Sequence, residues 1–139
     1  SGLKKNKYSK SYTQISMANL IINQSSLKKE INTNKCLIID ARPEARFKGE
    51  VEEPRPNLKK GNIKNSINIF FGSITNNSGY LKTKDDLIKI FKRLSKKKNV
   101  ICYCGSGITA CNIIFVLYIL NFNKIKLYDG SWAEWGKIK

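Results

Sequence analysis

The stretch Cys102-Tyr-Cys-Gly-Ser-Gly-Ile-Thr-Ala-Cys111 decides how this chain folds. An apolar, strand-like run begins at Asn99 and ends at Cys104, and a short loop of glycine and serine follows. From Thr109 the sequence continues as an apolar run with the length and composition of a helix. We therefore predict a strand, a tight loop and a helix in direct succession, with Cys104 at the turn.

Cys104 would lie at the N-terminus of that helix, which is a favourable place for a negative charge. The first N–H groups of a helix have no partner within the helix, and the helix dipole is positive at this end. Such surroundings lower the pKa of a thiol, and the thiolate is the form of cysteine that acts as a nucleophile. The sequence thus predicts a nucleophilic cysteine on an anion-binding loop.

Strand-like and helical segments alternate along the rest of the chain. Strands are predicted at 36–40, 66–70, 99–103 and 124–128, and helical segments at 13–31 (together with a short strand), 43–47, 83–97 and 109–120. This alternation predicts an α/β fold with a mostly parallel central sheet and helices on both faces. Such sheets bind ligands at the carboxyl ends of their strands, where Asp40 and Cys104 both lie.

The chain carries a formal net charge of +16, from 22 Lys and 4 Arg against 10 acidic residues, and two explanations compete. A basic surface is typical of nucleic-acid binding proteins. However, lysine is accompanied by 15 Asn and 19 Ile, which all have A/T-rich codons, and the lysines are scattered along the chain. We therefore interpret the charge as a compositional bias that also attracts anionic substrates, and we do not expect a nucleic-acid partner.

The four cysteines are not spaced like those of a small disulfide-bonded domain, and Cys36 and Cys102 lie inside apolar strands. We therefore predict free thiols and a reducing compartment, cytoplasmic or mitochondrial. A metal site is not expected, since the chain has no histidine and its Cys-x-Cys spacing does not suit zinc. The most apolar segment, 108–120, has 13 residues, whereas a membrane-spanning helix needs about 20, so no membrane partner is expected.

Four segments in a fixed order point to a known family: Asp40–Pro43, Gly61–Asn68, Cys104–Ala110 and Tyr128–Trp135. They resemble the motifs of the rhodanese superfamily, and more narrowly those of the C-terminal, catalytic domain of two-domain 3-mercaptopyruvate sulfurtransferases. The resemblance covers residues 13–139 and implies a rhodanese-like α/β domain. One motif departs from the family, because the common Gly-His-Ile-Pro-Gly is here Gly61-Asn-Ile-Lys-Asn65.

The loop after Cys104 sharpens the resemblance. Related thiosulfate sulfurtransferases carry Arg and Lys at the second and third loop positions, where this chain has Gly105 and Ser106, as 3-mercaptopyruvate sulfurtransferases do. Mercaptopyruvate has one carboxylate and a ketone, so it needs less positive charge beside its sulfur than a dianionic donor. The resemblance implies that sulfur is transferred from mercaptopyruvate or thiosulfate to Cys104, which becomes a persulfide. From there the sulfur would pass to cyanide or to a thiol acceptor such as thioredoxin or a small thiol. No cofactor is expected.

The resemblance also implies a role for the residues around Cys104. Ser106 would relay a proton or hydrogen-bond the substrate carbonyl. Thr109 would cap the helix and donate to the sulfur. The remaining loop residues would contact the substrate and the outer sulfur with their backbone: Gly105, Gly107 and Ile108.

Two arginines correspond to the family's substrate-binding positions, Arg46 and Arg55. In a chain with so few arginines, these two favour forked recognition of a carboxylate. The alternative is a structural ion pair with a nearby acid, Glu50, Glu52 or Glu53.

Other reactive or large side chains are interpreted as structural. Arg42 would anchor a strand end, and Asp40 would brace a loop or pair with an arginine rather than act as a base. The other cysteines would be buried, and the tryptophans would pack the end of the domain: Cys36, Cys102, Cys111, Trp132 and Trp135. A resolving role for Cys111, through a disulfide with Cys104, is the alternative.

Domain organisation follows from the same resemblance. Ser1-Gly2 in place of an initiator Met predicts a natural chain that extends upstream, and the basic residues 1–12 are interpreted as a tail or interdomain linker. The family's N-terminal rhodanese domain, which walls the active-site cleft, is missing from this chain, so the isolated domain is expected to have weakened activity.

Three other functions were weighed. A cysteine phosphatase needs an arginine six positions after its cysteine, where this chain has Ala110, so that class is excluded. A persulfide relay for tRNA or cofactor thiolation keeps the same cysteine and changes only the acceptor. A non-catalytic rhodanese module for protein interaction is the third alternative, and the complete Cys104 loop argues against it.

Overall fold

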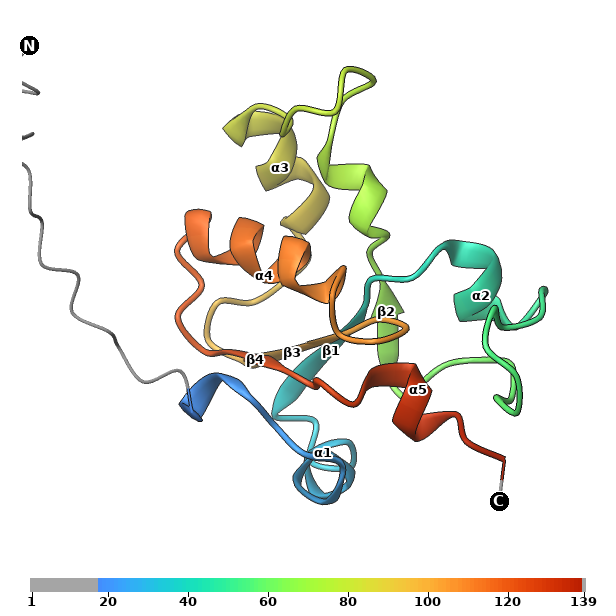
Figure 1. Cartoon of the computed structure of the whole chain (residues 1–139). Helices are drawn as coiled ribbons and strands as arrows, with labels where there is room; N and C mark the ends of the chain where they lie inside the picture. Colours follow the sequence, from blue (N-terminus) through green and yellow to red (C-terminus); the bar gives the residue numbers. More distant parts are fainter. Residues whose placement is uncertain (1–17, 139) are drawn as a thin grey trace, which may run out of the picture.

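The computed structural model of the chain describes residues 18–138, in which four strands form one sheet (Figure 1). The strands are β1 (Cys36–Asp40), β2 (Ser66–Asn68), β3 (Asn99–Tyr103) and β4 (Ile125–Leu127). They lie in the order β2-β1-β3-β4, and every neighbouring pair is parallel. A bridge between Ile21 and Leu127 adds one more parallel contact at β4. The predicted α/β fold with a parallel sheet is confirmed.

Helices cover both faces of this sheet. They are α1 (Gln24–Glu30), α2 (Glu44–Lys48), α3 (Lys84–Phe91), α4 (Ala110–Ile119) and α5 (Ser131–Trp135), with short 3-10 helices at Ala18–Leu20 and Phe71–Ile74. In Figure 1, α3 and α4 lie above the sheet and α1 lies below it. The second face is also packed by α5, so the predicted layers are confirmed.

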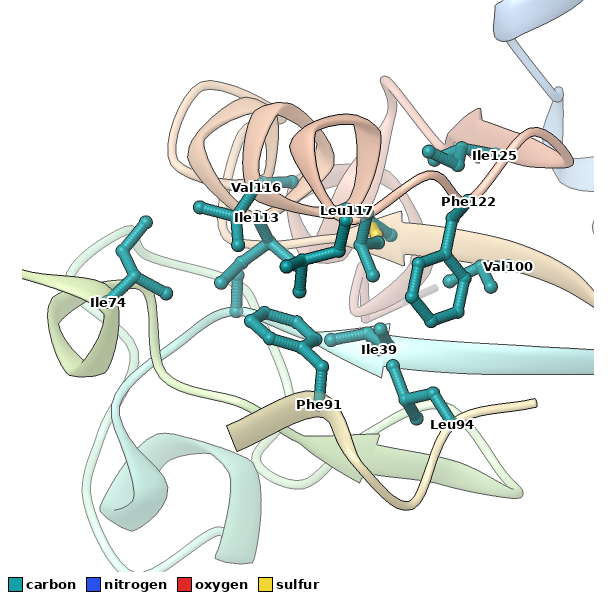
Figure 2. Packing of buried hydrophobic residues seen from close by; sticks show 14 of the residues in the cluster. Ile39, Ile74, Phe91, Leu94, Val100, Ile113, Val116, Leu117, Phe122 and Ile125 are labelled. Atoms are coloured by element: carbon teal, nitrogen blue, oxygen red, sulfur yellow. The ribbon is translucent and has the colours of Figure 1, made fainter. Parts of the chain in front are cut away.

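Side chains of the two central strands point alternately to the two faces. Ile39 and Cys102 are partners in the sheet and belong to the core under α3 and α4. Ile38 and Ile101, one residue earlier in each strand, belong to the core on the α1 and α5 side. Figure 2 shows the first core, where Phe91 of α3 and Ile39 of β1 both lie beneath α4. Burial on both faces explains why these strands are apolar throughout.

Helix α3 begins as predicted but ends earlier than the predicted range 83–97. Thr83 is its N-cap, and the Thr83 hydroxyl accepts the backbone N–H of Asp86 at 3.3 Å. The helix ends at Phe91, and the N–H of Leu94 then bonds the Phe91 carbonyl at 2.9 Å. This turn brings Leu94 into the core, where it stays 9% exposed, and leaves the lysines that follow outside the helix.

The first predicted segments are only partly described. The basic tail at 1–12 and the beginning of the segment 13–31 lie outside the described residues. In the described part, α1 supplies the predicted helix, and the Asn23 side chain caps it by accepting the Ser26 N–H at 2.9 Å. No helix among residues 18–138 combines the length and the apolar character needed to cross a bilayer.

Candidate active site

The Cys104 loop, residues 104–109, lies where β3 ends and α4 begins. Cys104 is only 2% exposed, and its Sγ accepts the backbone N–H of Gly107 at 3.1 Å. Gly107 has φ +90°, and a Cβ atom there would come within 3.0 Å of the carbonyl and carboxylate oxygens of Asp129. Glycine is therefore required at this position for the loop to curl around the sulfur.

Two opposing effects set the pKa of the Cys104 thiol. Burial raises the pKa, because the thiolate loses hydration. Hydrogen bonding from the Thr109 hydroxyl lowers it, and so does hydrogen bonding from three backbone groups, those of Ala110, Ser106 and Gly107. The hydrogen bonds prevail, so the pKa of Cys104 lies below its ordinary value, in the direction expected of a nucleophile.

Thr109 lies at the N-cap position of α4, as predicted, but its side chain does not cap the helix. Its hydroxyl makes no hydrogen bond to the first turn of α4, and it lies near enough to Cys104 to lower the pKa of that thiol. In the first turn of α4, the N–H groups of Cys111 and Asn112 bond the Ile108 and Thr109 carbonyls, and the N–H of Ala110 is left to act on the sulfur. The prediction that Thr109 caps the helix was therefore wrong, whereas donation from its hydroxyl to the sulfur stays a prediction.

A segment far along the chain holds the Cys104 loop in place. The Ser131 hydroxyl accepts the backbone N–H of Cys104 at 3.1 Å. The backbone N–H of Trp132 donates to the Cys104 carbonyl at 2.9 Å, and that of Ala133 donates to the Gly105 carbonyl at 2.9 Å. The beginning of α5 therefore fixes both residues that start the loop.

Ser131 itself has an unusual conformation for a residue with a side chain. It is completely buried, has φ +50°, and donates its hydroxyl to the Tyr128 carbonyl at 2.9 Å. This left-handed conformation costs about 1 kcal/mol for a residue other than glycine. Sequence reasoning missed Ser131, because it used the motif Tyr128–Trp135 only for the family resemblance and no local signal marks a contact across 27 positions.

A pocket of about 140 Å³ opens beside the Cys104 loop. Its lining residues are Arg46, Glu53, Pro54, Arg55, Leu58, Gly105 and Ser106. The pocket thus brings together both predicted arginines and two of the predicted loop residues. Its volume suits a ligand of a few heavy atoms. Ile108 does not line this pocket, and its side chain is 75% exposed on the outside of the loop.

Arg46 meets both interpretations made of it. It forms an ion pair with Glu53 at 2.5 Å, so the structural alternative is present. Its guanidinium also faces the loop, because a Cβ on Gly105 would lie only 3.1 Å from it. Arg55 is exposed, and within residues 18–138 it takes part in no ion pair. Arg55 therefore has its charge available for a ligand in the pocket.

Arg42 and Asp40 form the predicted anchor at the end of β1. Arg42 is 1% exposed and pairs with Asp40 at 2.6 Å and with Glu53 at 2.8 Å. It also donates to the Gly61 carbonyl at 2.7 Å. Since Glu53 bridges Arg42 and Arg46, the buried network sets the position of Arg46 at the pocket wall.

The other cysteines are free thiols, and one lies where it was not expected. Cys102 is completely buried, as predicted, whereas Cys36, at the start of β1, is only half-buried. Cys111, predicted to be buried, is exposed, and its thiol donates to the Gly107 carbonyl at 3.4 Å. Burial and the nearby Cys104 raise the pKa of Cys111, so it is a weaker nucleophile than Cys104. In the described part of the chain, no His, Cys, Asp and Glu cluster is arranged to hold a metal.

The departure from the family at Gly61–Asn65 leaves the fold intact. Gly61 has φ +107° and Asn65 has φ +65°. Asparagine is one of the few residues with a side chain that tolerates this left-handed conformation, so Asn65 can stand where the family has glycine.

Comparison with known proteins agrees with this geometry. A family model described as the Rhodanese-like domain matches residues 23–138. The chain belongs to the rhodanese family. This rhodanese chain is 46% identical over 105 residues to 3-mercaptopyruvate sulfurtransferase of Escherichia coli strain K12, a match that covers 74% of the chain and 37% of that protein. It is 32% identical over 109 residues to 3-mercaptopyruvate sulfurtransferase of Mus musculus, covering 77% of the chain and 37% of that protein.

A solved structure shows the same rhodanese arrangement. The crystal structure of SseA from Escherichia coli, described with the "Rhodanese" fold of 3-mercaptopyruvate sulfotransferases, matches with a TM-score of 0.70 and 36% identity. The match covers 83% of this chain and 43% of that one. The rhodanese chain therefore spans less than half the length of these relatives.

Proposed function

We propose that this chain is a sulfurtransferase domain that carries sulfur as a persulfide on Cys104. The observation that supports the proposal is the surroundings of the sulfur: a buried thiol with a lowered pKa that accepts the Gly107 N–H at 3.1 Å. Backbone N–H groups that stabilise the thiolate can also stabilise the outer sulfur anion of a persulfide. Relatives named 3-mercaptopyruvate sulfurtransferase, at up to 46% identity, agree with this activity.

In the first half-reaction, the Cys104 thiolate attacks the sulfur of 3-mercaptopyruvate. An S–S bond forms, the C–S bond of the donor breaks, and its electron pair leaves on the carbon as the enolate of pyruvate. The proton of the donor thiol goes to that carbon, so the products are pyruvate and an anionic Cys104 persulfide. Ser106, in the pocket wall, is placed to relay this proton or to hydrogen-bond the ketone.

The pocket favours 3-mercaptopyruvate over thiosulfate as the donor. Arg46 and Arg55 line it and offer forked donors to one carboxylate. Gly105 and Ser106 bring no charge to the side nearest the sulfur. Thiosulfate would react by the same route, with sulfite as the leaving group. However, the Cys104 loop has no cationic side chain to pair with the second negative charge of thiosulfate.

In the second half-reaction, a thiol acceptor attacks the outer sulfur of the persulfide. The acceptor gains that sulfur as its own persulfide, and Cys104 leaves as the thiolate. Thioredoxin or a small thiol can serve as this acceptor, and cyanide would instead take the sulfur as thiocyanate. The free cysteines fit a reducing compartment, cytoplasmic or mitochondrial.

The proposal includes a second domain in the functional protein. The sulfurtransferases that this chain matches are longer, with only 37% of their length covered. Such a domain would cover the open side of the pocket and exclude water from it. Activity of the chain alone is then expected to be low compared with that of the two-domain protein.

Release of pyruvate tests the proposal. Without an acceptor thiol, 3-mercaptopyruvate should yield about one pyruvate per chain, and with dithiothreitol it should yield pyruvate continuously. Cys104→Ser should release no pyruvate. Cys111→Ser, which removes the exposed thiol instead, is the control and should release as much pyruvate as the unsubstituted chain. Equal pyruvate release from Cys104→Ser and the unsubstituted chain would refute the proposal.

A further inference from the structure

Trp132 connects the two loops between which the pocket lies. Its backbone N–H donates to the Cys104 carbonyl at 2.9 Å. Its indole Nε1–H donates to the Lys59 carbonyl, also at 2.9 Å. The Trp132 side chain is 1% exposed, and its hydrogen bond to Lys59 is partly buried. One residue is thus bonded to the nucleophile loop and to the loop that carries Arg55.

The chain that follows α5 holds the same arginine loop. The Lys59 N–H donates to the Gly136 carbonyl at 2.8 Å, and the Ile138 N–H donates to the Asn57 carbonyl at 3.1 Å. An antiparallel bridge between Leu58 and Lys137 lies between these two bonds. The arginine loop, residues 54–60, is therefore paired with residues 136–138 as a short two-stranded ribbon.

The ring of Trp132 also supports Arg46, the other arginine of the pocket, through Arg42 and Glu53. The Arg42 guanidinium lies 4.4 Å from the centroid of this ring, a cation–π contact. Arg42 bonds Glu53, and Glu53 bonds Arg46 at the pocket wall. Trp132 therefore contacts the Cys104 loop, the loop that carries Arg55, and Arg42, which leads through Glu53 to Arg46.

We infer that Trp132 is a positioning residue that sets the distance between the Cys104 sulfur and the arginines that bind the substrate carboxylate. The inference rests on the proposed carboxylate-binding role of the pocket. Arg55 is exposed and has no ion pair in the described chain, so its position depends on the backbone of its loop. Small displacements matter in such a site, because the reacting sulfur and the carboxylate belong to one small molecule.

Substitution of the indole tests this role. Trp132→Phe keeps a ring over Arg42 and keeps the backbone bond to Cys104, but removes the donor to Lys59. The matched control is Trp135→Phe, on the same short helix, whose ring centroid lies 6.2 Å from that of Tyr128 and whose indole makes no hydrogen bond in the described chain. The probe is pyruvate, used as a competitor that slows alkylation of Cys104 by iodoacetamide, with the modified peptide followed by mass spectrometry.

A second variant leaves the core unchanged, in case the buried ring is needed for folding. Ile138 is 64% exposed, so Ile138→Pro removes only the N–H that bonds Asn57, while its control Ile138→Ala keeps that N–H. Trp132→Phe and Ile138→Pro should each weaken protection by pyruvate roughly threefold to tenfold, the effect of one lost hydrogen bond. The two controls should match the unsubstituted chain.

The pH at which alkylation of Cys104 is half-maximal separates positioning from general damage. It should stay unchanged in all four variants, because the donors to the sulfur are untouched. The inference would be overturned if pyruvate protected Trp132→Phe and Ile138→Pro as well as the unsubstituted chain, or if the two controls lost protection equally. It would also be overturned if pyruvate gave the unsubstituted chain no protection. Alkylation does not involve sulfur transfer, so weaker protection in the two variants supports the inference whether or not a persulfide forms. Failure to form a persulfide would refute the proposed function and not this inference.

Discussion

Cys104 and Cys102 show how two buried thiols in one strand–loop segment acquire opposite properties. Both are at most 2% exposed. Burial raises the pKa of Cys102, and the neighbouring thiols at Cys111 and Cys104 add to the rise. At Cys104 hydrogen bonds to the sulfur outweigh burial and lower the pKa. The direction of the shift therefore comes from donors aimed at the sulfur and not from depth in the fold.

Thr109→Val removes one of these donors and should raise the pKa of Cys104. Since the pKa is depressed in the folded chain, the thiolate is lost as the pH falls through it, and the loss should begin at a higher pH in the variant. Alkylation at pH 7 should slow by roughly tenfold or more, the effect of one hydrogen bond to a charged group. Thr109→Ser keeps the hydroxyl and should react like the unsubstituted chain; equal slowing in both would contradict the role of the hydroxyl.

Ser131 combines a strained backbone with two buried hydrogen bonds, and two substitutions separate these effects. Ser131→Ala keeps the strain at φ +50° and leaves the Cys104 N–H without its acceptor. Ser131→Gly loses the same bonds but relieves the strain, so it should be the more stable variant by about 1 kcal/mol. Urea denaturation measures the difference. A glycine variant that is no more stable than the alanine variant would show that the backbone at Ser131 is not strained.

At the scale of elements, the carboxyl ends of β1 and β3 place the site. β1 leads into the Asp40–Arg42 anchor, which continues through Glu53 to Arg46. β3 leads into Cys104. Because β1 and β3 are adjacent and parallel, with Asp40 opposite Tyr103, the nucleophile and the charge network leave the sheet at the same edge.

Asp40→Asn should disrupt this edge more than any substitution of a surface ion pair. It removes one of the two carboxylate partners of an arginine that is 1% exposed and leaves only Glu53, which Arg42 shares with Arg46; breaking a buried ion pair in this way costs about 3 kcal/mol. Glu44→Gln breaks an exposed pair with Lys48 on the neighbouring helix α2 and serves as the control. Urea denaturation midpoints should fall clearly for the first variant and stay close to the unsubstituted chain for the second. Equal midpoints would mean that the network does not hold the edge.

Local patterns were sufficient to predict the elements that carry the site. The apolar runs of β1 and β3, and the glycine-rich loop before α4, are readable from neighbouring residues. Exposure of Cys111 was not predictable in this way, because α4 is apolar on all sides and exposes Phe115 and Tyr118 as well. The roles of Ser131 and Trp132 depend on contacts with residues 27 and 73 positions away, which only the folded chain brings together.

At the scale of the whole molecule, the net charge of +16 should act on the rate at which donors arrive. A positive field attracts anions, and salt screens that attraction. Loading of Cys104 by dianionic thiosulfate should therefore slow by roughly threefold between about 20 mM and 200 mM salt, and loading by mercaptopyruvate should slow less. Alkylation by neutral iodoacetamide is the control and should not change. Equal salt dependence of all three reagents would remove a role for the net charge.

The central claim is that Cys104 accepts one sulfur atom from a small donor, and intact mass of the reduced chain tests it most directly. After incubation with 3-mercaptopyruvate, the mass should increase by one sulfur atom; the increase should be absent in Cys104→Ser and should remain in Cys111→Ser. Thiosulfate should load the same residue less completely. An increase that persists in Cys104→Ser, or no increase with either donor, would contradict the claim that this chain forms the persulfide on Cys104.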